Sequence, residues 1–143
     1  FRFYFPACRP LEINRPPRPE AKDWMLWNMV AAFGGSIAYT EQEHAILTEH
    51  NDALVLGQAE PLVPTLLPRV YANRFTAPGK TIWAIMNGTG HTVDAPLIQV
   101  EAAPDARYLD LLGQRELTPE ADGTIRCRLR RDQTILIARL TKP

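Results

Sequence analysis

The sequence lacks an excess of charge of either sign and lacks any long apolar run. Lys and Arg together number 16, as do Asp and Glu, so the formal net charge is zero. Proteins that bind nucleic acids or anionic membrane surfaces carry surplus positive charge on one face. A membrane-spanning helix needs about 20 predominantly apolar residues. We therefore expect neither nucleic acid nor a membrane among the partners of this protein.

Cysteine and histidine are scarce, which limits metal binding and nucleophilic catalysis. The two cysteines, Cys8 and Cys127, are far apart, and neither has a histidine nearby in the sequence. His44 and His50 are six positions apart and point to different faces of a helix, unlike the i, i+4 pair of a zinc-binding helix. We expect no metal site, no cofactor and no catalytic cysteine, and we interpret Cys127 as a small buried hydrophobic residue.

The first 60 residues combine a short strand with two helices. Residues 1–5, four of which are aromatic, are typical of a strand. After a proline-rich stretch, apolar residues recur at helical spacing over residues 20–33, which predicts a helix. Thr40–Glu43 has the form of a capping box and begins a second predicted helix, which Gly57 closes.

The opening of the chain suggests a piece of a larger protein. A natural protein rarely opens on an uncovered aromatic strand, because such an edge is prone to aggregation. We therefore expect the C-terminal part of a longer polypeptide, and a mature N-terminus after processing is the alternative.

Residues 61–143 carry the signature of a sheet. Pro61–Pro68 reads as a stiff connector and as the boundary between the two domains. Beyond it, Ile125, Cys127 and Leu129 alternate with arginines, as in a sheet with one wet face. Short strands are predicted at roughly even spacing: Val70–Thr76, Thr81–Asn87, Pro96–Val100, Arg107–Leu111, Ile125–Leu129 and Thr134–Leu140. We predict a mostly β fold, an antiparallel β-sandwich preceded by a short strand and two helices.

Two kinds of residue could carry carbohydrate chemistry. Carboxylate pairs hydrolyse glycosidic bonds. Among the aspartates of the β half, Asp94 and Asp105 lie at predicted turns, where such residues are common, and Asp110 lies on a predicted strand. We expect no catalytic residue in this chain. Trp24 and Trp27 lie one helical turn apart, and Arg9 follows the first strand. If that strand came from a parallel barrel, these residues would lie near its active-site mouth. We take these three as candidate substrate-binding residues, with core packing as the alternative, and expect Trp83 in the core.

The β half resembles a known architecture. Pro61–Leu66, Val70–Phe75 and Gly79–Asn87 resemble the junction into the C-terminal β-sandwich of glycoside-hydrolase-like proteins, in which a (β/α) barrel precedes such a sandwich. Asp94–Leu97 and Arg107–Leu111 are similar to later strands of the same sandwich. The resemblance implies that residues 1–60 are the end of a TIM-type barrel.

The resemblance also implies a function. This chain would be the non-catalytic C-terminal part of a carbohydrate-active protein, and the acid and nucleophile would lie upstream, since no residue here matches either. Its partner would be the rest of a larger polypeptide or a partner chain, with carbohydrate as a candidate ligand. The location stays open, with a secreted or a periplasmic one as the candidates. Two alternatives stay open: a self-contained carbohydrate-binding module with Trp24, Trp27 or Trp83 as its platform, and a protein-interaction domain.

Overall fold

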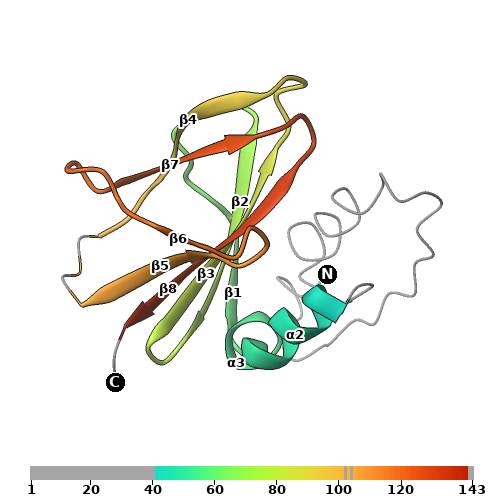
Figure 1. The fold of residues 1–143 in the computed structure, drawn as a ribbon, viewed down its shortest axis with the longest axis vertical. Coiled ribbons are helices and arrows are strands. Elements are labelled where there is room, and N and C mark those ends of the chain that lie inside the picture. The colour runs from blue at the N-terminus through green and yellow to red at the C-terminus, as the bar shows by residue number, and fades with distance from the viewer. Residues whose placement is uncertain (1–40, 102, 104, 142–143) are drawn as a thin grey trace.

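The computed structural model describes residues 41–101, 103 and 105–141 (Figure 1). Within these residues the chain forms two short helices, α2 (Glu41–Glu49) and α3 (Asn51–Leu54). Strands follow: β1 (Gln58–Val63), β2 (Val70–Ala77), β3 (Lys80–Asn87), β4 (Val93–Gln99), β5 (Ala106–Asp110), β6 (Arg115–Leu117), β7 (Thr124–Leu129) and β8 (Thr134–Thr141). Neither of these helices is long and apolar enough to span a membrane.

The strands form two antiparallel sheets. The large sheet has six strands in the order β1-β2-β3-β8-β5-β6, and the small sheet pairs β4 with β7. Buried residues of both sheets belong to one hydrophobic cluster, so the sheets pack face to face as a sandwich (Figure 1). The predicted mostly β fold and antiparallel sandwich are confirmed. The predicted strand at residues 1–5 and helix at residues 20–33 lie outside the described residues.

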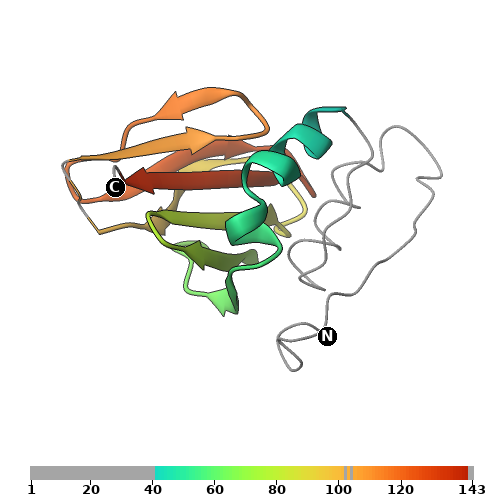
Figure 2. The same cartoon turned by 90° about the horizontal axis from the view of Figure 1, so that it is seen from below.

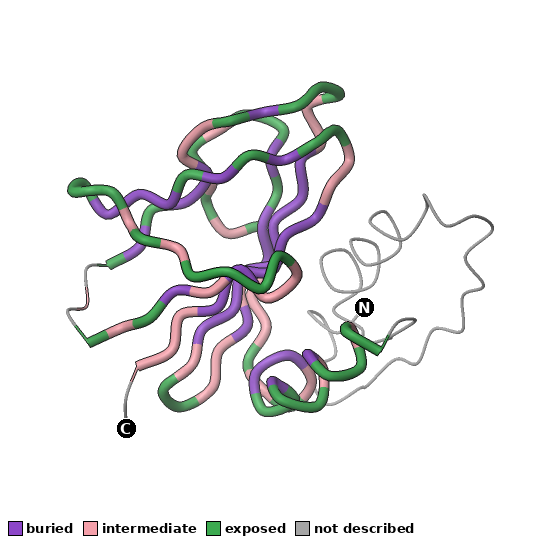
Figure 3. Tube along the Cα trace, in the orientation of Figure 1, coloured by how far each residue is buried: buried purple, intermediate pink, exposed green. Residues whose placement is uncertain are grey.

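The central strands of the large sheet are buried on both faces. On the inner face, Trp83, Ile85, Ile135 and Ile137 pack against the small sheet. The outer face belongs to a second cluster with the helices, made of Ile46, Ala53, Leu54, Phe75, Ile82, Ala84, Leu136 and Ala138. Figures 1 and 2 show α2 and α3 on the opposite side of the large sheet from β4 and β7. In Figure 3 the buried stretches accordingly run unbroken along the central strands.

The predicted strands agree with the observed ones within a few residues, with two exceptions. Residues 61–63, predicted as part of a proline-rich connector, continue the edge strand β1. Pro61 fits there because an edge strand tolerates a missing N–H, and the pairing with β2 is irregular between Glu60 and Val63. The three-residue β6 was not predicted, because so short an edge strand carries little hydrophobic pattern. The predicted boundary at residue 60 falls within β1, and the division into two domains stays a prediction.

The irregularity in β1 is held by a side chain of the neighbouring strand. Leu62 adopts a positive φ of 51°, and its backbone N–H donates to Oδ1 of Asn73 at 2.9 Å. Asn73 is buried, so its carbonyl oxygen satisfies a backbone group that the sheet does not pair. The irregular backbone of β1 is thus tied to β2 by a side chain.

Asn87, at the end of β3, joins the loops at one end of the sandwich. Its side chain is fully buried, and Nδ2 donates to the carbonyl oxygens of His91, Leu129 and Arg130 at 2.7, 3.2 and 2.9 Å. Its Oδ1 accepts from the backbone N–H and the hydroxyl of Thr89. A single amide thereby ties the loop after β3 to the end of β7, where the two sheets meet.

The predicted second helix is confirmed, but it is interrupted at His50. The His50 side chain is only 3% exposed, and its Nδ1 has no hydrogen-bond partner among the described residues. Burial, reinforced by the nearby charge of Lys80, lowers the pKa of His50. Lys80 of β3 in turn donates to Asp52 of α3 at 2.8 Å and thereby lowers the pKa of that carboxyl. The helices are therefore joined to the large sheet by apolar packing and by the Lys80–Asp52 ion pair.

The outer-face packing can be tested with a pair of identical substitutions. Leu136 is 2% exposed in the helix-covered cluster, whereas Leu66 is 45% exposed. Leu136→Ala should lower the free energy of unfolding by about 2–5 kcal/mol, because it leaves a cavity between sheet and helices. Leu66→Ala should change it by less than about 0.5 kcal/mol. Urea denaturation measures both, and equal losses would contradict a helix-covered outer face.

The buried His50 predicts a pH dependence of stability. Because the lowered pKa favours the neutral form in the folded state, the folded chain binds fewer protons than the unfolded chain at acidic pH. The free energy of unfolding should fall as the pH drops below about 6.5, the ordinary pKa of histidine. His50→Gln should weaken this fall between about pH 7.5 and 5, measured by urea denaturation. His44→Gln, on the exposed side of α2, is the matched control and should lose stability as the natural chain does. If the free energy of unfolding depends on pH in the same way in the natural chain and in His50→Gln, the prediction is wrong.

Candidate functional site: a polar pocket at the open end of the sandwich

The inner face of the large sheet changes from apolar to polar along its strands. The cross-strand row Ala72–Ile85–Ile135 lies in the core that both sheets share. The next row on the same face is Arg74–Trp83–Ile137, and the one after it is Thr76–Thr81–Arg139. The small sheet has only two strands, so it covers one part of this face and leaves the polar end open.

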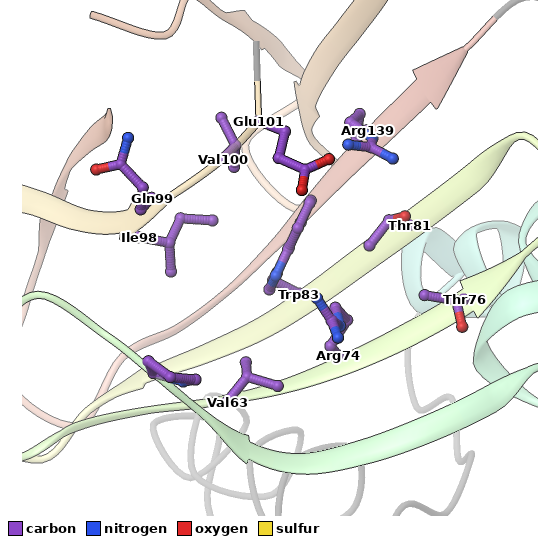
Figure 4. A pocket seen from close by; sticks show the side chains of 11 residues that line it. Val63, Arg74, Thr76, Thr81, Trp83, Ile98, Gln99, Val100, Glu101 and Arg139 are labelled. Atoms are coloured by element: carbon purple, nitrogen blue, oxygen red, sulfur yellow. The ribbon is translucent and has the colours of Figure 1, made fainter. Parts of the chain in front are cut away.

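A pocket of about 490 Å³ occupies this open end (Figure 4). Arg74, Thr76, Thr81, Trp83 and Arg139 line it from the large sheet. The end of β4 and the residues after it line the other side with Ile98, Gln99, Val100 and Glu101. Val63 and Pro64 lie at one edge. Figure 4 shows Trp83 and Thr81 on the large sheet with the Glu101 side chain across from them. The pocket is thus formed by segments far apart in the sequence.

The charges that line the pocket are balanced. Arg74 pairs with Glu60 through a contact of 2.6 Å between its guanidinium and the carboxylate. Within the described part of the chain, the side chains of Arg139 and Glu101 form no hydrogen bond or ion pair, and the hydroxyls of Thr76 and Thr81 have no partner either. One cation, one anion and two hydroxyls are therefore available to a bound molecule.

Trp83 forms an inner wall of the pocket and is not a flat platform. Its side chain is 7% exposed and packs in the shared core, which confirms its predicted core position. A stacking platform needs a largely accessible ring face. Trp83 can therefore offer a small accessible part of its indole to a ligand, but it cannot stack on an extended one.

The pocket is equipped for binding. No histidine or cysteine lines it, and the described residues hold no group of three or more side chains that could ligate a metal ion. Cys127 is buried in the core, as predicted, and burial raises its pKa to about 11, so its thiol is not an activated nucleophile. The chemistry that the pocket offers is hydrogen bonding from neutral and charged groups.

The aspartates considered for catalysis lie outside the pocket, and Asp110 and Asp94 are held in contacts with arginines. Asp110 is buried at the end of β5, where Oδ1 accepts from the Gly113 N–H at 2.8 Å and Oδ2 from Arg115 at 3.0 Å. A side chain at position 113 would overlap this carboxylate, which explains the glycine. Asp94 lies 3.7 Å from Arg126, and Asp105 is exposed in a turn. Asp110 thus closes the turn between β5 and β6.

The candidate substrate-binding residues Arg9, Trp24 and Trp27 lie outside the described residues and stay predictions. The pocket itself was not predicted from the sequence. One sequence feature could have indicated it: arginine and threonine occur at inward-facing positions of strands that are otherwise apolar on that face. Arg74 and Thr76, which follow Ala72 on the inner face of β2, are examples. That signal becomes readable only when the register is known.

Comparisons with known proteins bear on the fold. A scan against protein-family models and a search of curated proteins find no match to this sequence. Among solved structures, a Bacillus halodurans protein assigned as an α-N-acetylgalactosaminidase is similar over 90% of this chain, with a TM-score of 0.60 and 10% identity. An Anoxybacillus α-amylase is similar over 71%, with a TM-score of 0.52 and 16% identity. The chain spans 34% and 22% of the length of these two structures, which share its fold.

Proposed function

We propose that this chain is a non-catalytic, accessory β-sandwich of a carbohydrate-active, glycoside-hydrolase-like protein. The observation that carries the proposal is the similarity to parts of two glycoside hydrolases, one of which matches 90% of this chain with only 34% of its own length. In that arrangement a sandwich of this size is one part of a longer polypeptide. The sugar-processing residues then lie in the remainder, which the sequence resemblance puts upstream.

Exposed apolar side chains near α3 and at the β1–β2 edge support contact with another part of a longer polypeptide. Large apolar side chains are exposed after α3 and on the strands at one edge of the large sheet: Leu56 at 63%, Leu62 at 71% and Tyr71 at 42%. The helices cover the central strands beside these residues. We infer that the rest of a larger polypeptide, or a partner chain, rests on this side of the sandwich, while nucleic acids and membranes are not partners.

A self-contained carbohydrate-binding module is the second candidate function. The pocket favours it, because balanced charges and free hydroxyls suit a neutral polar ligand without any contribution from another domain. The two functions differ in what they require of the natural polypeptide. The accessory role needs a longer chain, and the module does not.

The mass of the natural polypeptide and its activity test the accessory role together. We expect an intact mass well above the 16.1 kDa of this chain. We also expect p-nitrophenyl α-glucoside or p-nitrophenyl N-acetyl-α-galactosaminide to be hydrolysed by the long polypeptide and not by this chain. A natural mass of 16.1 kDa would overturn the accessory role and leave the binding module. Turnover of either glycoside by this chain alone would overturn both.

A further inference from the structure

We propose that the pocket at the open end of the sandwich binds a single neutral sugar ring, held by Arg139, Glu101 and Thr76 against Trp83. The inference concerns this chain alone and holds whether or not the sandwich belongs to a larger enzyme. It rests on the charge balance, the unpaired polar groups and the volume of the pocket.

The charge balance favours a neutral ligand. Arg74 is already paired with Glu60 at 2.6 Å, so it contributes little net charge to the pocket. Arg139 and Glu101, whose side chains lack partners among the described residues, carry opposite charges. An anion would meet the Glu101 carboxylate and a cation would meet the Arg139 guanidinium, so each pays a repulsive contact that a neutral molecule avoids.

The unpaired groups match the hydroxyls of a sugar. A guanidinium only donates hydrogen bonds and a carboxylate only accepts them, whereas a threonine hydroxyl does both. A sugar hydroxyl also donates and accepts, so neighbouring hydroxyls on one ring can satisfy Arg139, Glu101 and Thr76 at once. Trp83 supplies an apolar wall for the C–H groups of the ring.

The size of the pocket fits a small ligand. Its volume of about 490 Å³ lies near the lower end of the range for small-molecule sites, about 300–1,000 Å³. The large sheet and the end of β4 bound it on two sides, and Trp83 is only 7% exposed, so a long polymer cannot stack flat on its ring. One ring, or the end of a short oligosaccharide, is the ligand that these walls accept.

Titration by heteronuclear NMR tests the proposal on the whole chain. The probes are D-glucose, D-galactose and maltose, added to about 50 mM because a single-ring site is expected to bind with millimolar affinity. The Trp83→Phe variant assigns the indole N–H signal of Trp83 by its loss. We expect at least one neutral sugar to shift this signal in a saturable manner. D-glucuronate, the same ring with a carboxylate, should bind no more tightly than D-glucose.

Two variants and a matched control locate the site. Arg139→Gln should weaken binding about tenfold, because it removes a charged hydrogen-bond donor. Thr76→Val, which keeps the shape of the side chain, should weaken it about threefold or more. Arg128→Gln makes the same charge change at an exposed position of β7 and should leave binding unchanged. Circular dichroism confirms that each variant is folded.

Three results would overturn the proposal. The first is that none of the three neutral sugars shifts the Trp83 signal in a saturable manner. The second is that Arg139→Gln, Thr76→Val and the natural chain bind the sugar with equal affinity. The third is that D-glucuronate binds more tightly than D-glucose. None of these depends on the mass or the hydrolytic activity of the natural polypeptide. The accessory role and the sugar pocket can therefore fail independently of each other.

Discussion

The structure depends on the burial of both faces of the strand pair β3 and β8. Seven of the eight residues of β3 are buried, and the first five residues of β8 are buried too. A strand buried on both faces needs an apolar layer on each side. The small sheet provides one layer and the helices provide the other, so elements from both halves of the sequence are needed to complete one sheet.

The same constraint explains where a ligand could bind. The two-stranded small sheet covers the apolar rows of the inner face and leaves Arg74 and the row of Thr76, Thr81 and Arg139 at its open end. The sequence places side chains there that tolerate water. Their charges balance across the pocket between Arg139 and Glu101. The pocket therefore follows from the unequal sizes of the two sheets, and its polar lining provides hydrogen-bonding groups.

Sequence patterns predicted most of the strands and their antiparallel sandwich, but not which strands pair with one another. The alternation of Ile125, Cys127 and Leu129 with arginines identified β7 because one of its faces is wet. In β3 the alternation is lost, since Ile82 and Trp83 are buried on opposite faces, and a pattern alone does not tell which strands pair with it. The pocket could not be predicted for the same reason. Arg74 and Arg139 are 65 positions apart, and only the antiparallel register through β3 brings them to one end of the sheet.

The irregular edge strand β1 has a consequence for how this protein behaves at high concentration. An exposed edge strand invites a second chain to extend the sheet through free backbone donors. In β1, Pro61 has no N–H to offer, and the N–H of the next residue, Leu62, is already bonded to Asn73. Two consecutive positions therefore offer an incoming strand no free N–H donor. The proline and the buried asparagine together make this edge a poorer template for a second strand.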